Sequence, residues 1–385
     1  MSSGSIVDKK KERLTKSTLE CGLVKPPIKW VGGKTQIIEE VIDNFPSEIH
    51  NFHEIFLGGG SVLIALLSSY GYINKKDKQN KQCARIKITG KISAFDINKD
   101  LIYMFRNIRN NPTELCKELG KIRKLFFNLD RPEKKSKASS EESSEEENGK
   151  TKRKQIEVPK TRKEASKSDQ ERFYYWIRQQ YNLNRNDEVK RKGVLNSAMF
   201  IFLNKTCFRG VYREGPTGFN VPYGNYANPQ IYDKNHLLVL SELFKNYKVK
   251  FECRSFTKSI KGLGVGDFIY MDPPYAPETK TSFVGYVSDG FDIEKHEKLF
   301  KMTQKICEDG AQFLMNNADV ALVRKYFVKE KENKNKSVKV EKTKKSEKEK
   351  CICKYYVHKL EAKRSIHSKD PSSTTTEVII KNYKL

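Results

Sequence analysis

Phe268-Ile269-Tyr270-Met271-Asp272-Pro273-Pro274-Tyr275 is the stretch on which the predicted fold depends. Its first four residues form a short apolar run rich in β-formers, which predicts a buried strand. The two prolines end that strand, because proline lacks an amide donor and fixes φ. Asp272 is therefore expected at the carboxyl end of a strand, where open α/β sheets bind their ligands.

The residues that follow this strand suit the methylation of a planar amine. Such an amine is a poor nucleophile, because its lone pair is delocalised into the ring. Asp272 and the carbonyl of Pro273 can accept its two hydrogens and so localise the lone pair, while Tyr275 can stack on the base. Taken alone, the stretch is also compatible with a simple turn that ends a strand.

Composition and charge favour a polyanionic partner. The chain has 385 residues, enough for two or three domains. Hydrophobic residues make up 37% and charged residues 32%, so part of the chain is expected to be unfolded. An excess of 74 Lys and Arg over 48 Asp and Glu gives a net charge of +26. This charge favours nucleic acid through phosphate neutralisation, although lysine-rich tails supply part of it.

The cysteines indicate a reduced, intracellular protein. Eight are scattered along the chain without a C-x-x-C pair, and Cys351 and Cys353 form the closest couple. We therefore expect no disulfide framework and no metal. No apolar run approaches the roughly 18–20 residues of a membrane span, and the N-terminus lacks a signal peptide. The expected location is the cytoplasm or nucleoid, or a host cell if the source is viral.

Two glycine turns precede predicted helices. Residues 33–35 (Gly-Lys-Thr) are not a phosphate loop, because Ile28 stands where that motif requires glycine. Their turn still offers free amides to an anion such as a carboxylate. Residues 56–60 (Phe-Leu-Gly-Gly-Gly) join a predicted strand to a buried helix at 61–67. This arrangement lets the backbone approach a nucleotide-like ligand, although a plain tight turn fits equally well.

A second acidic strand end is predicted at Asp96. In a mononucleotide fold, an acid at this place accepts hydrogen bonds from ribose hydroxyls. Its separation from Gly60 (96 − 60 = 36 residues) exceeds the usual spacing of about 20. A polar, basic surface insertion at 74–91 explains the difference. Residues 101–127 are then expected to be helical.

A hairpin is predicted within residues 204–226. Short β-like runs flank a Gly-Pro-Thr-Gly turn at 215–218, and Arg, Tyr and Asn are frequent around it. A two-stranded ribbon fits the major groove of DNA, where arginine pairs bidentately with guanine. Taken alone, such a segment is more often a simple surface hairpin than one that reads bases.

The order of these motifs resembles that of the Dam-type N6-adenine DNA methyltransferases of the alpha group. The resemblance covers roughly residues 22–385 apart from the charged insertions. The matching stretches are residues 28–34, 56–60, 96–98, 204–226, 251–275, 364–366 and 376–379. It implies an α/β fold, namely a Rossmann-like class I methyltransferase sheet with an inserted helical target-recognition domain that carries a β-hairpin.

The resemblance also implies a division of the chain. Low-complexity charged runs predict the two insertions. A loop after Tyr275 is long enough to act as a lid. The expected parts are a flexible tail at 1–20, a cofactor-binding half of the catalytic domain at 21–128, a disordered charged insertion at 129–170, a target-recognition domain with the hairpin at 171–245, a second catalytic half at 246–385, a lysine-rich insertion at 329–350 and the lid at 279–291.

Roles of individual residues follow from the same resemblance. The adenine pocket and catalytic motif would be Asp272, Pro273, Pro274 and Tyr275. S-adenosylmethionine would contact Trp30, Lys34, Phe56, Gly58, Gly60, Asp96, Ile97, Ser255, Phe256 and Asp272. DNA would contact Lys29, Lys205, Arg209, Val211, Arg213, Asn220, Pro222 and Tyr226. The hairpin is slightly shortened around 215–216, and Arg209 replaces the asparagine of close relatives, which puts the target sequence in question.

The implied enzyme is a site-specific DNA methyltransferase that acts on adenine N6. A methyl group would pass from S-adenosylmethionine to an adenine flipped out of double-stranded DNA. Asp272 would serve as a hydrogen-bond acceptor rather than a strong base. The hairpin most resembles those that read a short palindrome such as GATC or GANTC. We expect a monomer that can pair on DNA, with restriction protection as one of several possible roles.

Two other functions compete with this interpretation. A protein or amine methyltransferase usually has asparagine where Asp272 stands and lacks the base-reading hairpin. A catalytically silent DNA-binding partner of the same fold has no chemical reason to keep both Asp-Pro-Pro-Tyr and the Trp30/Lys34 element. Binding of the cofactor, measured by calorimetry, separates the silent partner from the enzyme.

Overall fold

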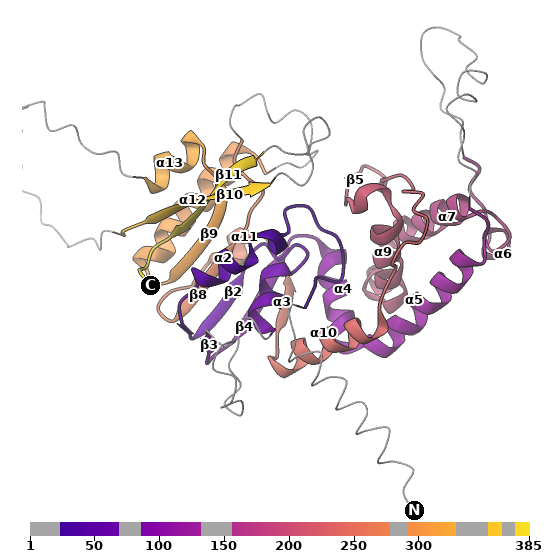
Figure 1. Ribbon diagram of the computed structural model, residues 1–385, viewed down its shortest axis with the longest axis horizontal. Helices are drawn as coiled ribbons and strands as arrows, with labels where there is room; N and C mark the ends of the chain where they lie inside the picture. Colours follow the sequence, from indigo (N-terminus) through magenta and orange to yellow (C-terminus); the bar gives the residue numbers. More distant parts are fainter. Residues whose placement is uncertain (1–23, 69–85, 132–155, 278–290, 329–352, 364–373) are drawn as a thin grey trace, which may run out of the picture. The chain divides into compact units, whose positions relative to one another are not determined.

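A mixed seven-stranded sheet forms in the computed structural model, which describes residues 24–68, 86–131, 156–277, 291–328, 353–363 and 374–385. The strand order is β10-β11-β9-β8-β2-β4-β7 (Figure 1). Strands β9, β8, β2, β4 and β7 run parallel, whereas β11 is antiparallel to both of its neighbours. The strand bounds are Asn51–Glu54 (β2), Ile92–Asp96 (β4), Lys250–Cys253 (β7), Asp267–Met271 (β8), Gln312–Ala318 (β9), Tyr356–Lys363 (β10) and Thr374–Lys381 (β11).

The expected strand of the Asp-Pro-Pro-Tyr stretch is confirmed as β8. Four of its five residues are buried, and it pairs with β2 and β9 in the middle of the sheet. Side chains alternate between the two faces along each strand. Ile269 and Met271 pack on one face, while Phe268 and Tyr270 contact Phe45 on the other. Both faces of the strand are therefore covered, as its continuous apolar run predicts.

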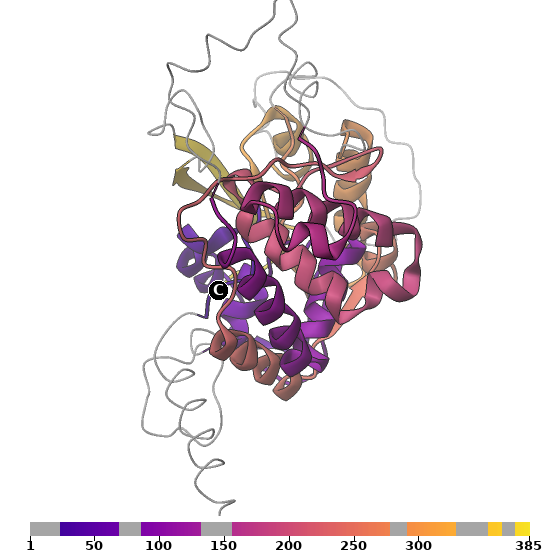
Figure 2. The same cartoon turned by 90° about the vertical axis from the view of Figure 1, so that its right-hand side faces the viewer.

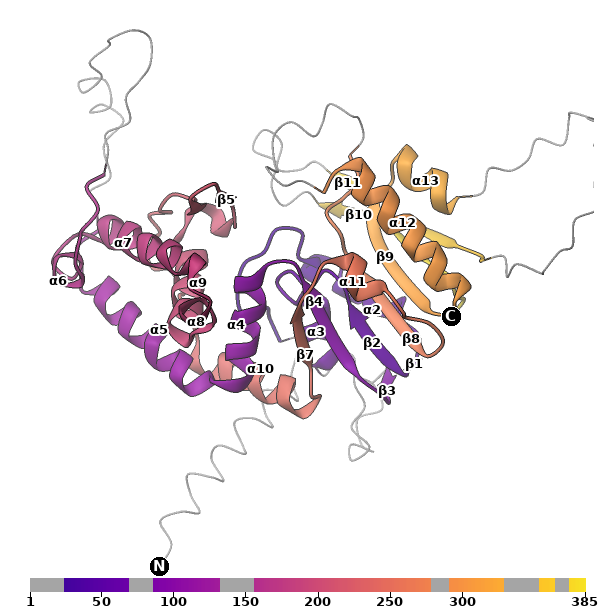
Figure 3. The ribbon, with the colours of Figure 1, turned by 180° about the vertical axis from the view of Figure 1, so that it is seen from behind.

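Helices cover both faces of the sheet. The face that carries Ile269 packs against α11, α12 and α13, and Figure 3 shows α11 and α12 in front of it. The opposite face, which carries Phe45 and α2, is turned toward the viewer in Figure 1. This doubly wound arrangement is consistent with the expected methyltransferase fold. The bounds are Lys34–Gln36 (η1), Ile38–Asp43 (α2), Ser61–Leu67 (α3), Phe256–Ile260 (α11), Ile293–Glu308 (α12) and Ala321–Phe327 (α13).

The topology of the sheet defines where a ligand can bind. From β2 the chain proceeds to β4 and β7 on one side, and it returns to β8 and β9 on the other. The strand order thus reverses beside β2, and ligands of open α/β sheets bind at the carboxyl ends of the strands at such a point. The loops after β2 and β8, which begin at Ile55 and Asp272, flank this position.

A second compact unit is mainly helical. The helical unit comprises residues 26–31 and 103–242, and the remaining described residues form the sheet unit. Helices α5, α7 and α9 pack on one another (Figure 2). Phe126, Phe173 and Phe202 are in mutual ring contact there. The bounds are Lys99–Asn110 (α4), Pro112–Phe127 (α5), Arg162–Ala165 (α6), Gln170–Leu183 (α7), Asn184–Asn186 (η3), Glu188–Lys192 (α8), Val194–Thr206 (α9), Phe208–Gly210 (η4) and Lys234–Asn246 (α10).

The predicted hairpin is present but short. Strands β5 (Glu214–Gly215) and β6 (Gly218–Phe219) pair antiparallel around Pro216 and Thr217. Gly218 has φ +109°, a conformation that strongly favours glycine. An isolated two-residue pair is not stable by itself. The hairpin is fixed by Asn182 of α7, whose side chain donates to the carbonyl of Phe219 and accepts from its amide.

Several expected boundaries differ in the structure. The compact helical unit includes residues 103–242, whereas the target-recognition domain is expected at 171–245, and that expected division stays a prediction. Of the expected disordered insertion, 132–155 lie outside the described residues, whereas 156–170 contain α6. The expected helix at 101–127 is two helices, because Asn111 ends the first and Pro112 begins the second.

The surface insertion expected at 74–91 is described only from residue 86. There, β3 (Lys87–Ile88) pairs in parallel with β1 (Glu48–Ile49), so this end of the segment is part of the fold. Residues 279–290 of the expected lid and the whole insertion at 329–350 lie outside the described residues.

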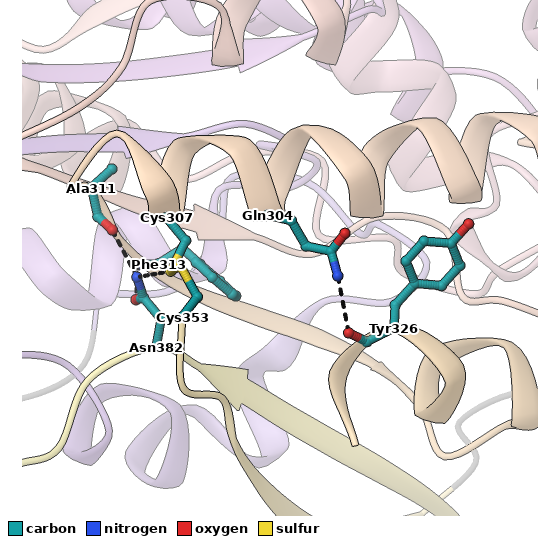
Figure 4. Close-up of a disulfide and its surroundings, with 7 residues drawn as sticks. All are labelled: Gln304, Cys307, Ala311, Phe313, Tyr326, Cys353 and Asn382. Atoms are coloured by element: carbon teal, nitrogen blue, oxygen red, sulfur yellow. Dashed lines mark hydrogen bonds between the residues drawn. A yellow bond between two sulfur atoms is a disulfide. The ribbon is translucent and has the colours of Figure 1, made fainter. Parts of the chain in front are cut away.

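A disulfide corrects the expectation that the cysteines are reduced. Cys307, near the end of α12, is bonded to Cys353, just before β10 (Figure 4). The Asn382 side chain donates to the Cys307 sulfur and to the carbonyl of Ala311, at 3.2 and 2.8 Å. The two cysteines are 46 residues apart, so their spacing gave no local signal.

Among the helices of the described residues, none is long and apolar enough to cross a membrane.

Candidate functional site

Asp272 lies directly after β8 and is held from one side. Its Oδ2 atom accepts a hydrogen bond from Lys34 Nζ at 2.7 Å, and Lys34 also donates to the carbonyl of Gly32 at 2.8 Å. The Lys34 side chain is 5% exposed and that of Asp272 17%. The buried Oδ1 atom of Asp272 has no hydrogen-bond partner among the described residues. The carboxylate is thus fixed by one oxygen and free to accept hydrogen bonds with the other.

Burial and charge act in opposite directions on this carboxylate. Burial raises the pKa of Asp272, whereas the Lys34 ammonium lowers it. Glu54, at the end of the neighbouring strand β2, is 2% exposed. Burial and the nearby Asp272 raise the pKa of Glu54 well above its usual value. Glu54 therefore keeps its proton more readily, which leaves the Lys34 charge to Asp272.

The segment after Asp272 is held by residues from the far end of the sheet unit. The Tyr275 hydroxyl donates to Glu377 Oε2 at 2.6 Å, and the Ala276 amide donates to Asn317 Oδ1 at 3.0 Å. Lys34 Nζ also lies 5.0 Å from the centre of the Tyr275 ring. Pro273 is buried and Pro274 is exposed. Lys34, Asp272 and Tyr275, which are far apart in the sequence, are therefore brought together.

The glycine turn after β2 is joined to Asp96 at the end of β4. The amide of Gly58 donates to Asp96 Oδ2 and that of Asn98 to Oδ1, both at 2.9 Å. Gly58 and Gly60 have φ of +49° and +75°, which favours glycine at both positions. Burial raises the pKa of Asp96, and the backbone donors partly offset the effect. Three of the expected cofactor residues thus belong to one hydrogen-bonded turn.

The aromatic residues expected at the cofactor also cluster. The rings of Phe56 and Phe256 stack with centres 6.0 Å apart, and Phe291 contacts both. Ser255 is the N-cap residue of α11, directly before Phe256. Ile97, next to Asp96, is 70% exposed although it is apolar. A single exposed apolar side chain is common on protein surfaces, so the cofactor contact expected of Ile97 stays a prediction.

Trp30 and Lys29 belong to the helical unit, whereas Lys34 belongs to the sheet unit. The Trp30 ring stacks on Tyr212, with centres 5.3 Å apart. Asn204 clamps the backbone of Lys29: its side chain accepts from the Lys29 amide at 2.9 Å and donates to the Lys29 carbonyl at 2.8 Å. The cofactor contact expected of Trp30 stays a prediction.

Residues expected to read DNA lie on and around the hairpin. Arg213 Nε donates to Asn220 Oδ1 at 2.8 Å, and both side chains are exposed. The Pro222 carbonyl accepts from the amide of Phe208 at 2.9 Å. Val211 is half-buried. The guanidinium of Arg213 therefore has one partner on the hairpin and remains accessible on the surface.

A cluster of cations lies beside these residues. Lys29 Nζ is 5.4 Å from the centre of the Tyr226 ring. Burial and the nearby charge of Lys29 lower the pKa of Lys205 to about 8. Lys205 is half-buried and Lys29 is exposed, and an anion near them would favour the charged form of Lys205. This arrangement suits a phosphate or the acceptor edge of a base.

Arg209 occupies an unusual backbone conformation. Its φ is +56° and its ψ is 8°, in the left-handed region that disfavours most side chains. Asparagine, which is expected here from the resemblance, tolerates this region better. The guanidinium of Arg209 lies over the neighbouring Phe208 ring, which is 51% exposed. The substitution thus adds a surface cation at a position shaped for asparagine.

Sequence reasoning missed four residues of the candidate site. These residues act through long-range contacts, since they hold the Asp-Pro-Pro-Tyr segment, neighbour Asp272 or clamp Lys29. Only their place at strand ends or beside matched motifs could have indicated them. They are Glu54, Asn204, Asn317 and Glu377. No group of three or more metal-binding side chains occurs within the described part of the chain.

Comparison with known proteins agrees with this geometry. The profile of the family described as D12 class N6 adenine-specific DNA methyltransferase matches residues 30–346. The type II methyltransferase M.MjaIII of Methanocaldococcus jannaschii is 34% identical over 304 residues, 77% of this chain and 84% of the relative. The type II methyltransferase M1.LlaDCHI of Lactococcus lactis is 25% identical over 363 residues, 94% of this chain and 96% of the relative.

More distant relatives carry a related name. The DNA adenine methylase of Escherichia coli strain K12 is 24% identical over 306 residues, which cover 79% of this chain and 84% of the relative. The family profile spans the turn with Lys34, both acidic strand ends, the hairpin and Asp-Pro-Pro-Tyr. The chain therefore belongs to the family of D12 class N6 adenine-specific DNA methyltransferases.

Proposed function

We propose that this methyltransferase transfers a methyl group from S-adenosylmethionine to the N6 atom of an adenine flipped out of double-stranded DNA at a short target site. The observation that carries the proposal is the state of Asp272. Its Oδ2 is fixed by Lys34, while its buried Oδ1 has no partner among the described residues. A buried acceptor without a partner is unfavourable, so a ligand donor such as the adenine amine is expected there.

The chain's own residues can activate the amine. Asp272 Oδ1 and the Pro273 carbonyl, at the end of β8, are the proposed acceptors of the two N6 hydrogens. Their pull localises the nitrogen lone pair, and Tyr275 offers a ring for stacking. Burial raises the pKa of Asp272, but the Lys34 ammonium counteracts this effect. The carboxylate can therefore be ionised when it accepts a hydrogen bond from the adenine amine. Positioning and preorganised acceptors then supply most of the rate increase.

The residues around the glycine turn fit S-adenosylmethionine. Asp96 can share its carboxylate with ribose hydroxyls, and the exposed Ile97 and the Phe56–Phe256 pair offer apolar surface to an adenine ring. Lys34 sits between this turn and Asp272, because its amide donates to Ser61 Oγ at 3.2 Å. When bound, the cofactor supplies an electrophilic methyl group.

The helical unit is the proposed target-recognition domain. The exposed Arg213 can pair with a guanine, and Lys29, Lys205 and Arg209 can neutralise phosphates. The proposed target is a short palindrome, for which GATC and GANTC are the candidates because of the resemblance of the hairpin segment. Adenine must leave the stack for its amine to be reached, so base flipping is part of the proposal.

Methyl transfer to a plasmid tests the proposal. The plasmid is incubated with the protein and with S-adenosylmethionine that carries a labelled methyl group, and N6-methyladenine is then mapped at single-base resolution. We expect label at adenines of one short motif. Label on cytosine or on protein, or no label despite binding of the cofactor, would contradict it.

A further inference from the structure

The hydroxyl of Tyr275 is held by a residue that follows it by 102 positions. It donates to Glu377 Oε2 at 2.6 Å. The topology of the sheet explains the meeting. Because β11 is antiparallel to β9, its first half lies at the edge where β8 and β9 end, and Glu377 pairs with Ala318, the last residue of β9.

Three contacts restrict Tyr275 and its neighbour. Glu377 holds the hydroxyl, the Lys34 ammonium lies 5.0 Å from the ring centre, and Asn317 holds the next amide at 3.0 Å. A hydrogen bond to an ionised acceptor is shorter and stronger than a neutral one. Since Lys34 also pairs with Asp272, the carboxylate and the ring belong to one chain of contacts.

Glu377 is an unfavourable choice for a purely structural residue of a strand. It is partly buried, and no cation pairs with it among the described residues. Its charge also acts on Asp272, whose pKa it raises. A β-branched residue such as valine suits a strand better. The charge at this position is therefore best explained by its effect on Tyr275.

We propose that Glu377 is a positioning residue that holds the Tyr275 ring in the orientation on which the flipped adenine stacks. The inference rests on the proposed function and adds a residue to it. Without this hydrogen bond the ring can rotate about its side-chain torsions, and the base loses its fixed platform. Methyl transfer then slows, while binding of S-adenosylmethionine is unchanged.

A double-mutant cycle tests this role. The variants are Glu377→Val, which keeps strand propensity but removes the acceptor, Glu377→Gln, which keeps a neutral acceptor, Tyr275→Phe, and Tyr275→Phe combined with Glu377→Val. Glu297→Ala is the matched control, because Glu297 forms an exposed pair with Lys325 at 3.6 Å. Single-turnover methylation, melting temperature and the fluorescence of 2-aminopurine placed at the target adenine are measured for each.

We expect Glu377→Val to lower the single-turnover rate about tenfold, as for the loss of one hydrogen bond to a charged group. Glu377→Gln should recover most of the rate. In the Tyr275→Phe background, Glu377→Val should add no further loss. The 2-aminopurine signal of the bound complex should change in Glu377→Val, because quenching by stacking on the ring is reduced, and the Glu297 control should match the unaltered protein.

Other results overturn the inference in distinguishable ways. An equal loss from Glu377→Val in both backgrounds shows that Glu377 does not act through Tyr275. A wild-type rate in Glu377→Val removes the role altogether. If Glu377→Val fails to fold, the other variants decide. A tenfold loss of rate in Glu377→Gln contradicts the inference, and so does a 2-aminopurine signal of Tyr275→Phe that equals that of the unaltered protein. Absence of methyl transfer by the unaltered protein overturns the proposed function instead.

Discussion

At the level of single residues, the central feature of the candidate site is that the Asp272 carboxylate is only partly hydrogen-bonded. Lys34 fixes one oxygen of Asp272 and leaves the other free. Burial and the charge of Asp272 raise the pKa of Glu54, and burial and the charge of Glu377 raise that of Asp272. Among the described residues, Lys34 is the cation that pairs with Asp272, and several carboxyl groups lie near it. The protonation state of Asp272 then decides whether its second oxygen can accept a hydrogen bond.

The first prediction concerns the pH dependence of methyl transfer. Burial raises the pKa of Asp272, so the active ionised form is lost as the pH falls through a value above the 3.9 or so of an ordinary aspartate. Because Lys34 lowers that pKa, Lys34→Met should move the acid limb of the pH–rate profile to higher pH. Single-turnover rates between pH 5 and pH 8 check this. An acid limb at the same pH in both proteins contradicts the pairing.

The second prediction uses the lowered pKa of Lys205. The free protein loses the Lys205 proton as the pH rises through about 8, and bound phosphate restores it. DNA affinity at fixed salt should therefore fall about tenfold between pH 7 and pH 9, more steeply than in Lys205→Met. Fluorescence anisotropy with a labelled duplex measures it. The same pH dependence in Lys205→Met would show that another group titrates.

The third prediction concerns the strained backbone of Arg209. Arg209→Asn should raise the free energy of unfolding by about 0.5–1 kcal/mol, since asparagine tolerates the left-handed region better. Urea unfolding measures the gain, and Arg209→Ala should give none. Lys248→Asn is the matched control, because exposed Lys248 has φ +49°. It should give a similar gain without the loss of DNA affinity expected at Arg209. A lower stability of Arg209→Asn would contradict the strain.

At the scale of elements, the signals that act locally were predictable. An apolar run stopped by two prolines is sufficient to place β8, and the glycine turn before Ser61 places α3. The partner of Tyr275 was not predictable, because only the antiparallel pairing of β11 brings Glu377 to that edge. Sequence order contains no sign of such a contact.

Helix α6 shows a local signal that was present but missed. Thr161 Oγ1 accepts from the Glu164 amide, and the Glu164 side chain accepts from the Lys160 amide. This is close to the capping pattern in which Thr is followed three residues later by Glu. The surrounding charged runs led us to expect disorder up to residue 170. The capping pair instead marks the start of a helix within the segment expected to be disordered.

The fourth prediction concerns the disulfide that connects α12 with the segment before β10. Reduction, or Cys353→Ser, should lower the free energy of unfolding by about 2–4 kcal/mol, because the bond closes a long loop in the unfolded chain. Melting temperatures with and without reductant measure this. Cys351→Ser is the matched control and should melt like the unaltered protein. Equal melting temperatures in both redox states would contradict a bond between Cys307 and Cys353.

At the scale of the whole molecule, two units supply different parts of the proposed reaction. The sheet unit contains Lys34 and Asp272, which are proposed for the cofactor and amine chemistry, and the helical unit contains the hairpin and its cations. The sequence predicted both sets of residues. It could not predict that Trp30 packs with the helical unit and Lys34 with the sheet unit, because four residues of sequence give no indication of a boundary.

The most direct measurement is the single-turnover rate of adenine N6 methylation by Asp272→Ala, with DNA and cofactor binding measured beside it. Removing the acceptor should lower the rate by at least about 10²–10³-fold, as for the loss of a preorganised hydrogen-bonding group in other active sites. Non-specific DNA binding should persist, because the cations of the helical unit are untouched. A rate equal to that of the unaltered protein would contradict the assignment of Asp272 as the acceptor of the adenine amine.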